Sequence, residues 1–422
     1  MLHAGRRLHG ASWYMKPMRN VVFVAPFPLD TTMRFARAAA GLDDVRLLGI
    51  MQEAPQGDDR NLFVDLVIVR DGLDADQLIE AAQLLHRRYG QIHRVLGILE
   101  AIQVQLGEVR RALGVPGTKP ETADLFRDKQ LMKDRVEAAG LRVPRAVRAR
   151  TAAEARAAAE QIGYPMIVKP IAGAGSADTY RVDDAAQLEA TLAKTQHVSV
   201  VSCEEFIDGE EFTFDTVCVD GVPAFANVAQ YLPHPLIART NEWISPIIIT
   251  VRDLEQPALA GGLALGRGVL DALGMGDGFT HMEWFRKADG DVVFGEIGCR
   301  PGGAHLVDQM NYTCDIDLFR EWARAVCWGK FEAPTRRKYN VAIIFKRAKG
   351  HGRITRIDGL REFMRRYGEH VVEQRLLPPG TPRRNWKQTL VSDGYILLRH
   401  PDWETTYQLA YEAATDITMY AE

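Results

Sequence analysis

The chain has 422 residues, of which 46% are apolar and 25% are charged, a composition typical of a folded globular protein. Its length is that of about two to four domains. With 52 basic and 55 acidic side chains the formal net charge is −3, which excludes a strongly basic surface for nucleic acid or for an anionic membrane.

The apolar runs and the cysteines indicate the compartment. No apolar run approaches the roughly 20 residues that a membrane span needs, and the start of the chain lacks the continuous apolar core of a secretory signal. The five cysteines are odd in number and no pair has C-x-x-C spacing, which indicates reduced thiols. We therefore expect a cytoplasmic protein with neither nucleic acid nor a membrane as a partner.

Residues 1–18 differ from the residues that follow. They are rich in Arg, His and Gly and show no hydrophobic period, whereas an apolar run begins shortly after Met18. We expect translation to start at Met15 or Met18, so that residues 1–18 are a disordered extension. A functional disordered arm is the alternative.

From residue 21 to about residue 112, short apolar runs alternate with helical patterns. This alternation predicts a parallel sheet with right-handed crossovers, in an α/β domain over residues 19–120. The loop after the first strand, at 26–30, lacks the G-x-G-x-x-G pattern of a dinucleotide site. The predicted strands are 21–25, 45–51, 67–69 and 94–99, and the predicted helices are 31–40, 74–89 and 101–113.

Two further segments follow this domain. A helix over about 123–139 ends at Gly140, and another opens at Thr151 with Glu154 three residues later, as in a capping box. A strand-rich stretch comes next, and the pattern changes again after residue 330. We expect a middle domain over 121–332 and a small α+β domain over 333–422. The predicted C-terminal strands are 341–345, 353–357 and 395–399, and the predicted helices are 360–367 and 403–419.

The first chemical element is a strand that ends in one lysine. Lys169 follows the apolar run 165–168, and glycines and a serine follow directly, within 171–176. A lysine supplies a point charge for phosphate oxygens, and glycines let backbone N–H groups approach a polyanion without interference from Cβ. A hairpin with a solvated lysine explains the same residues, so this element alone leaves both interpretations open.

The second element, residues 198–215, is a strand, a short acidic linker, a turn at Gly209 and a second strand. Such a linker can present backbone N–H and C=O groups to the flat edge of a base, and a carboxylate shortly after it can accept both hydroxyls of a ribose. A plain β-hairpin with exposed acids is the alternative, which these residues by themselves favour.

The third element is a pair of strands, 281–285 and 292–298, joined by a glycine turn. Each strand carries one acid among apolar neighbours, Glu283 and Glu296, and buried carboxylates are costly unless they are paired or bound to metal. A divalent cation between facing carboxylates removes their repulsion, and Mg²⁺ prefers oxygen ligands. Arg300 can neutralise charge on a transferred phosphoryl group. We therefore expect a metal site here rather than a hairpin with surface acids.

These three elements occur in the order and spacing of the ATP-grasp superfamily. The chain resembles the ligases of that superfamily from about Val21 to Gly329, and most closely from Lys129 to Gly303. The resemblance implies a two-part α+β fold that grips ATP between its halves, behind an N-terminal α/β domain. It also implies ATP and Mg²⁺ as cofactors, with Mn²⁺ as an alternative metal.

The resemblance assigns a role to each motif residue. Two lysines bind phosphates, a glycine-rich segment covers them, a backbone hinge reads adenine, one acid holds the ribose, two acids bind magnesium, and an arginine steadies the acyl phosphate. The second lysine and the arginine count as catalytic. The lysines are Lys129 and Lys169, the glycine-rich segment contains Gly173, Gly175 and Ser176, the hinge is Glu204 and Ile207, the ribose acid is Glu211, the metal acids are Glu283 and Glu296, and the arginine is Arg300.

One position departs from the family pattern. Many members have an asparagine two residues after the second metal acid, as a third ligand or a phosphate contact, whereas this chain has Gly298. We therefore expect the second magnesium ion to be held less firmly, unless Glu296 binds both ions.

The activity that the resemblance implies is that of a carboxylate–amine ligase. A carboxylate attacks the γ-phosphate of ATP to give an acyl phosphate and ADP, and an amine then forms an amide or peptide bond and releases phosphate. The alternatives are a biotin carboxylase-like enzyme that uses bicarbonate and a nucleotide-binding regulator without catalysis. The expected partners are small carboxylates and amines, amino acids among them, and a homodimer is common in the resembling family.

Several residues are candidates for substrate contacts. We expect the stretch 233–243, before the third element, to form a loop over the site. In it, Arg239 could bind a carboxylate and Trp243 an apolar side chain, although a surface loop with one packed aromatic explains both equally well. His305 and Asn311 are further candidates. His281 alternates with the first metal acid along its strand, and we expect a core histidine at this position.

Overall fold

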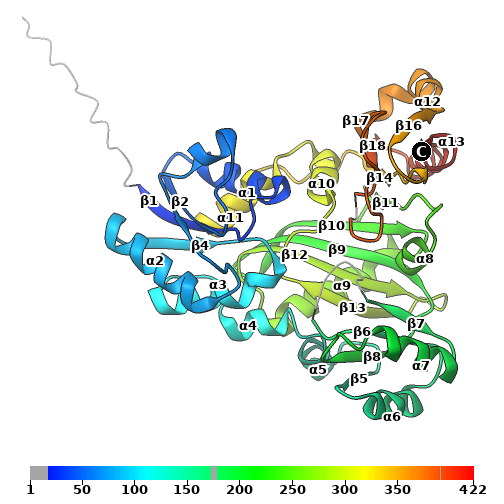
Figure 1. The fold of residues 1–422 in the computed structure, drawn as a ribbon, viewed down its shortest axis with the longest axis horizontal. Helices are drawn as coiled ribbons and strands as arrows, with labels where there is room; N and C mark the ends of the chain where they lie inside the picture. The colour runs from blue at the N-terminus through cyan, green and yellow to red at the C-terminus, as the bar shows by residue number, and fades with distance from the viewer. Residues whose placement is uncertain (1–17, 173–177, 390) are drawn as a thin grey trace, which may run out of the picture.

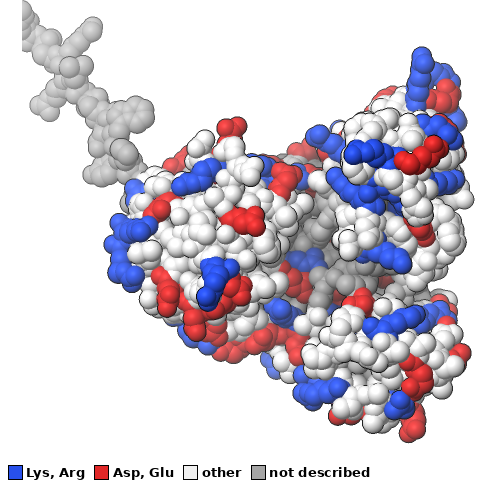
Figure 2. Space-filling view, in the orientation of Figure 1, with Lys and Arg blue, Asp and Glu red and all other residues white. Residues whose placement is uncertain are grey.

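The computed structural model describes residues 18–172, 178–389 and 391–422, and Figure 1 shows their arrangement. A parallel N-terminal sheet, a small antiparallel sheet and a long antiparallel sheet surround a central hollow, which Figure 2 shows from one side. The expected combination of a parallel α/β domain with α+β parts is confirmed. Residues 1–17 of the predicted extension lie outside the described residues. Within the described ranges, no helix has the length and apolarity to cross a membrane.

The N-terminal sheet forms because apolar strands alternate with helices, as the sequence predicts. Its strand order is β3-β2-β1-β4, and its strand pairs are parallel. Buried residues such as Val22 and Phe23, which alternate along β1, fill the core on both faces of the sheet. The elements are β1 (Arg19–Val24), α1 (Asp30–Ala40), β2 (Val45–Met51), β3 (Asp65–Ile68), α2 (Ala75–Tyr89), β4 (Ile92–Leu96) and α3 (Gln103–Leu113).

The predicted helix over 123–139 is wrong in one respect, because the chain forms two helices there, α4 (Pro120–Leu125) and α5 (Lys129–Ala138). The break occurs at Asp128, whose carboxylate accepts hydrogen bonds of 3.0 Å from two backbone N–H groups of the following turn. An aspartate in this position caps the start of a new helix. Lys129 is therefore the first residue of α5 rather than part of a helix interior.

The small sheet is antiparallel, with the order β5-β8-β6-β7. Helices α6 and α7 bury alanine and leucine side chains against it. The predicted capping box begins α6 as expected, because Thr151 Oγ1 accepts a hydrogen bond of 3.1 Å from the backbone N–H of Glu154. The elements are β5 (Ala146–Ala149), α6 (Ala152–Ile162), β6 (Met166–Pro170), β7 (Tyr180–Val182), α7 (Ala185–Lys194) and β8 (Val201–Glu205).

The long sheet has eight strands in the order β13-β12-β9-β10-β11-β14-β18-β17, and it continues from the predicted middle domain into the predicted C-terminal domain, since β14 pairs directly with β11. The boundaries at 120 and 332 stay predictions. The strands are β9 (Glu210–Val219), β10 (Val222–Leu232), β11 (Ile247–Thr250), β12 (Gly278–Arg286), β13 (Val292–Gly298), β14 (Asn340–Phe345), β17 (Val371–Leu376) and β18 (Gly394–His400). The neighbouring helices are α8 (Pro235–Thr240), α9 (Pro257–Leu273), α10 (Leu306–Cys314) and α11 (Leu318–Trp328).

The last residues of the chain form a small sheet with the order β15-β19-β16. The predicted helix over 403–419 is therefore too long, because α13 (Trp403–Asp416) ends before β19 (Thr418–Ala421). Ile417 and Met419 are buried and alternate with less buried neighbours, which is the pattern of a strand. The remaining elements are β15 (Lys349–Gly350), β16 (Ile354–Asp358) and α12 (Leu360–Tyr367).

Two glycines let α9 approach the long sheet closely. A Cβ atom on Gly262 would lie 2.2 Å from the ring of Trp284, and a Cβ atom on Gly266 would lie 2.4 Å from the ring of Phe214. Both rings are buried. Because the two glycines are four residues apart, they lie on the same face of the helix. Only hydrogen fits at both positions, so α9 packs directly on β9 and β12, whose opposite face carries the candidate site.

We expect Gly262→Ala to lower the free energy of unfolding by about 1–3 kcal/mol, because the added methyl group overlaps a buried ring. Gly261→Ala is the matched control, since its Cβ would lie 3.2 Å from a methyl group of Val292 on the exposed side of the helix. There, alanine should leave stability unchanged or raise it by up to about 1 kcal/mol through its helix propensity. Urea unfolding measures both, and equal effects of the two variants would contradict this account of the packing.

Candidate active site

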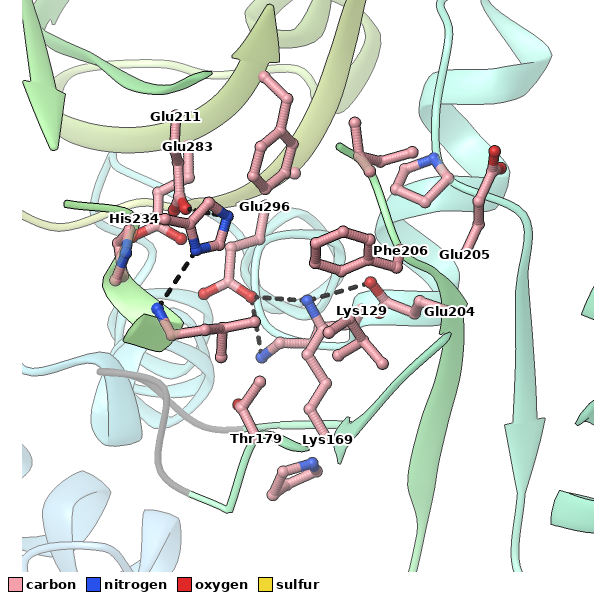
Figure 3. A pocket seen from close by; sticks show the side chains of 18 residues that line it. Lys129, Lys169, Thr179, Glu204, Glu205, Phe206, Glu211, His234, Glu283 and Glu296 are labelled. Carbon is pink, nitrogen blue, oxygen red and sulfur yellow. Dashed lines mark hydrogen bonds and ion pairs between the residues drawn. The ribbon is translucent and has the colours of Figure 1, made fainter. Parts of the chain in front are cut away.

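A pocket lies between the small sheet and the long sheet, and charged side chains from six elements line it (Figure 3). Three of them are acids on the long sheet. Two are lysines from α5 and β6, and two are neighbouring acids at the end of β8. In chain order these residues are Lys129, Lys169, Glu204, Glu205, Glu211, Glu283 and Glu296.

The register of the long sheet places its three acids on one face. Glu283 pairs directly with Glu296 across β12 and β13, and Glu211 on β9 pairs with Phe285 on β12. Directly opposed residues in antiparallel strands point to the same face, and so do residues two apart on one strand. The residues that alternate with them, such as Phe212 and Trp284, point to the core under α9. The apolar and acidic alternation in the sequence therefore separates a core face from a site face.

A chain of ion pairs joins the lysines to two of the acids. Lys169 Nζ lies 3.3 Å from Glu296 Oε2 and 3.1 Å from Glu204 Oε2. Lys129 Nζ lies 3.5 Å from Glu296 Oε2, and Lys133 Nζ donates to Glu204 Oε1 at 2.9 Å. Figure 3 shows Lys129 and Lys169 pointing toward Glu296. Two carboxylates thus hold three ammonium groups together inside the protein.

These contacts shift the pKa values of the acids they neutralise. Burial alone would raise the pKa of Glu204, but the charges of Lys133 and Lys169 outweigh it and lower this pKa to about 2. Burial would likewise raise the pKa of Glu296, but the nearby lysines, Lys129 first, hold it well below its usual range. Burial lowers the pKa of Lys133 to about 8. Both acids are therefore ionised at neutral pH.

The other two acids lie in a different electrostatic environment. Burial and the charge of Glu296 raise the pKa of Glu283, and burial and the charges of Glu283 and Glu296 raise the pKa of Glu211 well above its usual value. Tyr231 donates a hydrogen bond of 3.4 Å to Glu283 Oε1. His234 Nε2 lies 3.1 Å from Glu211 Oε2, without hydrogen-bond alignment. This half of the pocket therefore favours an added cation.

The acidic half of the pocket fits a magnesium ion. Glu283 and Glu296 are opposed across two strands, and their repulsion contributes to the raised pKa of Glu283. Within the described ranges, no group of three or more His, Cys, Asp or Glu side chains has the geometry of a complete metal site. Magnesium commonly keeps waters and phosphate oxygens beside one or two carboxylates. Glu283 and Glu296 would therefore hold the ion together with ligands that come from the substrate.

A second cavity adjoins this pocket and contains Arg300. Glu283, Glu296 and Lys129 line both spaces, and Glu100 and His281 line only the second. Arg300 Nε donates to Glu100 Oε2 at 2.7 Å. Burial would lower the pKa of Arg300, but the charge of Glu100 and its hydrogen bond outweigh it and raise this pKa. Arg300 and Glu100 are therefore a charged pair in the wall of this cavity, beside the acids and the lysine that it shares with the first pocket.

The glycine that departs from the family pattern lies beside this ion pair. A Cβ atom on Gly298 would lie 3.3 Å from Glu100 Oε2 and 3.3 Å from the Arg300 side chain. These distances are shorter than ordinary van der Waals contact, so an asparagine side chain at this position would compete with Glu100 for space. Gly298 makes room for a carboxylate from the N-terminal sheet domain, which the sequence interpretation missed.

His281 is buried, as expected of a core histidine, yet it also lines the second cavity. Its Nδ1 lies 2.5 Å from Asp215 Oδ1, and its Nε2 lies 3.8 Å from Glu283 Oε1. Burial lowers the pKa of His281, but the charge and hydrogen bond of Asp215 outweigh it and raise this pKa. Asp215 also accepts a hydrogen bond of 3.1 Å from Asn227. The histidine ring is thus held in one orientation beside Glu283.

The structure places the remaining candidates as follows. Ile207 lines the first pocket. Trp243 is 74% exposed, and His305 Nδ1 lies 3.0 Å from Asp308 Oδ2. Asn311 accepts a hydrogen bond of 2.8 Å from the backbone of Leu318, which fixes the start of α11. The glycine-rich segment with Gly173, Gly175 and Ser176 lies outside the described residues, as does the side chain of Arg239.

Three contributors to the site were not predicted, Glu100, Lys133 and Tyr231, whereas His234 lies in the stretch 233–243 that was expected to form a loop over the site. Two of them have a signal in the sequence. Lys133 is four residues after Lys129 and therefore lies on the same face of the helix. Glu100 follows the carboxyl end of β4, the edge of a parallel sheet where ligands commonly bind. Tyr231 and His234 reach the site only through the course of β10 and the loop after it.

Comparisons with known proteins agree with this geometry. The family profile described as "Carbamoyl-phosphate synthase L chain, ATP binding domain" matches residues 128–210. Over 264 residues the chain is 25% identical to the L-arginine-specific L-amino acid ligase of Bacillus subtilis, an alignment that covers 61% of this chain and 63% of that protein. The chain spans 63% and 64%, slightly less than two thirds, of the first curated relatives that it matches.

Solved structures extend the similarity over nearly the whole chain. The L-amino acid ligase from Bacillus licheniformis has a TM-score of 0.78 at 20% identity and covers 96% of this chain and 100% of its own. The N5-carboxyaminoimidazole synthetase from Staphylococcus aureus, solved in complex with ADP, has a TM-score of 0.69 at 15% identity and covers 94% and 97%. The chain has the fold of the ATP-grasp ligases, and the resemblance seen in its sequence is confirmed.

We expect Glu204→Gln to lower the free energy of unfolding at pH 7 by about 3–5 kcal/mol, because two buried ammonium groups lose their shared carboxylate. The pKa of Glu204 is lowered from 4.5 to about 2 in the folded protein. The stability that Glu204 contributes is therefore present above about pH 4.5 and is lost as the pH falls toward 2. Over this window, stability should fall less steeply in the variant than in the wild type, as urea unfolding at several pH values would measure.

Glu205→Gln is the matched control for this prediction. Glu205 is the next residue on β8, and its partners are the exposed side chains of Arg142 and Arg145. Because surface ion pairs contribute little, we expect a loss of less than about 1 kcal/mol. Comparable losses in the two variants would show that the lysine cluster does not depend on Glu204.

Proposed function

We propose that this chain is an ATP- and magnesium-dependent carboxylate–amine ligase, which activates a carboxylate as an acyl phosphate and joins it to an amine. One arrangement carries the proposal. Glu283 and Glu296 oppose each other on β12 and β13, and Lys129 and Lys169 lie 3.5 and 3.3 Å from Glu296. Two acids for a divalent cation beside two fixed ammonium groups suit the bridged phosphates of a nucleotide.

The lining of the pocket supports an ordered position for ATP. Phe206 and Ile207 supply an apolar surface for the base, and Glu211 is a carboxylate that can accept the ribose hydroxyls. Lys129 and Lys169 bind the phosphates, and by resemblance the glycine-rich segment around Gly173, Gly175 and Ser176 covers them. The S. aureus neighbour with ADP supports a nucleotide in this fold.

The residues of the chain act by positioning and by neutralising charge. The substrate carboxylate attacks the γ-phosphorus, the bond to the bridging oxygen breaks, and ADP leaves with that electron pair. An amine then attacks the acyl carbon and phosphate leaves, while the proton of the amine passes to water or phosphate. Lys169 and Arg300 stabilise the negative charge that shifts between these groups. Magnesium, when bound by Glu283 and Glu296, adds charge neutralisation at the phosphate oxygens.

The second cavity supports amino acids as substrates. Arg300 and Glu100 line it, joined by a hydrogen bond of 2.7 Å, and an α-amino acid that separated this pair would offer a carboxylate to the first and an ammonium group to the second. The printed names of the two L-amino acid ligases among the similar proteins agree with this class. All five cysteines are unpaired thiols, which suits a reducing cytoplasm.

The test is ADP release from MgATP with amino acids supplied singly and in pairs, and with bicarbonate as a separate addition. We expect one pair of amino acids to stimulate ADP release and Glu296→Ala to lower that rate at least about 100-fold, because it removes a metal ligand and a phosphate-site counter-charge. Stimulation by bicarbonate alone would favour the carboxylase alternative. MgATP binding without any stimulated turnover would favour a regulator.

Two adjacent acids on β9 give a test of the nucleotide position. Glu211 faces the pocket, whereas Glu210 is half-exposed and pairs with Arg286, the last residue of the neighbouring strand β12. We expect Glu211→Gln to weaken MgADP binding about tenfold through loss of a charged hydrogen-bond acceptor, and Glu210→Gln to leave it unchanged. Isothermal titration calorimetry measures both. Equal affinities for the two variants would remove Glu211 from the nucleotide site.

A further inference from the structure

A short segment, residues 233–243, crosses from the proposed nucleotide pocket to the C-terminal part of the chain, residues 333–422. We call this segment the strap. It follows β10 and contains α8. His234, Pro235 and Leu236, at its beginning, line the pocket. His234 Nε2 lies 3.1 Å from Glu211 Oε2. One end of the strap therefore touches the acid assigned to the ribose.

Two arginines from the C-terminal part hold the other end of the strap. Arg347, two residues after β14, donates from Nη1 to the carbonyl oxygens of Ala238 at 2.6 Å and Asn241 at 3.0 Å. Arg383 has its Nη2 at 2.6 Å from Glu242 Oε1. The Arg347 bonds satisfy carbonyl groups at the end of α8, which the helix itself leaves without partners, and the Arg383 contact is an ion pair with a side chain of the strap.

Both arginines are fixed by their own surroundings. The side chain of Arg383 is 7% exposed, and its Nε donates at 3.3 Å to Asp393, which is fully buried. The guanidinium of Arg347 lies 4.6 Å from the ring centre of Trp386. Arg383 and Trp386 lie in the connection between β17 and β18, whose orange-red ribbon reaches toward β10 in Figure 1. The strap is thus attached to a buried ion pair and an aromatic ring of the C-terminal part.

The described side chains of the strap include two that add little packing. A six-residue helix such as α8 is not stable by itself. The large apolar side chains of Ile237 and Trp243 are 50% and 74% exposed, so they contribute little packing. The His234 ring packs near Phe206 and Phe285 at the pocket end, and the polar contacts to Arg347 and Arg383 hold the other end.

We propose that Arg347 and Arg383 are positioning residues for nucleotide binding, which act through the strap to hold His234 and Leu236 against the nucleotide. The inference rests on the proposed function in that the ligand is ATP or ADP. It assigns to the C-terminal part of the chain a role in the affinity for nucleotide, although none of the residues described after 333 lines the pocket itself.

The test uses Arg347→Met and Glu242→Arg in the full chain. The first removes the bonds to the strap carbonyls, and the second turns the ion pair with Arg383 into a repulsion while leaving the bond between Arg383 and Asp393 in place. Glu362→Arg is the matched control, since it breaks an exposed ion pair with Arg365 on α12. We measure the Kd for MgADP by calorimetry, hydrogen exchange of peptides over 233–243 by mass spectrometry, and the thermal unfolding temperature.

We expect Arg347→Met and Glu242→Arg each to raise the Kd about five- to tenfold, the scale of one or two charged hydrogen bonds, and to speed hydrogen exchange in the strap. Glu242→Asp should restore most of the affinity, and Glu362→Arg should change neither quantity. The unfolding temperature should stay within a few degrees of the wild type in every variant.

A Kd that is unchanged in both variants, beside normal binding by the wild type, would overturn this inference alone. A raised Kd without faster exchange in the strap would also overturn it, because the effect would then not pass through the strap. Absence of MgADP binding by the wild type would overturn the proposed function and this inference with it.

Discussion

The sharing of Glu296 between Lys129 and Lys169 is the interaction on which the rest of the site depends. It joins α5 and β6, a strand of the small sheet, to β13 of the long sheet. Glu204 on β8 adds Lys133 to the same group of ion pairs. Bringing three ammonium groups together inside a protein requires such carboxylates, because unpaired buried charges are costly. The same arrangement leaves the neighbouring acids under-neutralised. A metal–nucleotide complex carries both signs of charge and so complements both halves of the pocket.

The site also needs the N-terminal sheet, because Glu100 reaches Arg300 from the end of β4. Helix α1 packs on α11 through aromatic side chains, with the Phe35 ring centre 5.0 Å from that of Trp322. This packing fixes the N-terminal sheet relative to the long sheet. Gly298 belongs to the same arrangement, because it leaves the space that the Glu100 carboxylate occupies. A departure from the family pattern in one motif is thus matched by a side chain that lies almost 200 residues earlier in the sequence.

The sequence predicted the parallel first domain and the motif residues of the pocket because each depends on local pattern: alternation of strands with helices, or an acid among apolar residues at every second position. It missed the break before Lys129 because an aspartate cap inside a helical pattern is hard to distinguish from a surface residue. It missed Glu100 and Tyr231 because their roles follow from the packing of distant segments, and it indicated the loop that carries His234 without singling out that side chain. Asn311 was a candidate for substrate contact, but it bonds the start of α11, a role that its spacing alone does not reveal.

The continuous long sheet has a consequence for how such chains can recombine. A gene fusion joined near residue 332 would cut the polypeptide in a connecting segment, yet the segment after it supplies β14, which pairs with β11 over four residue pairs. An exchanged C-terminal module would therefore have to match a hydrogen-bonding edge in both register and twist, and would also have to bring arginines that meet the strap. We expect that an exchange of segments between related chains preserves the fold only if β11, the strap and the C-terminal part are exchanged together.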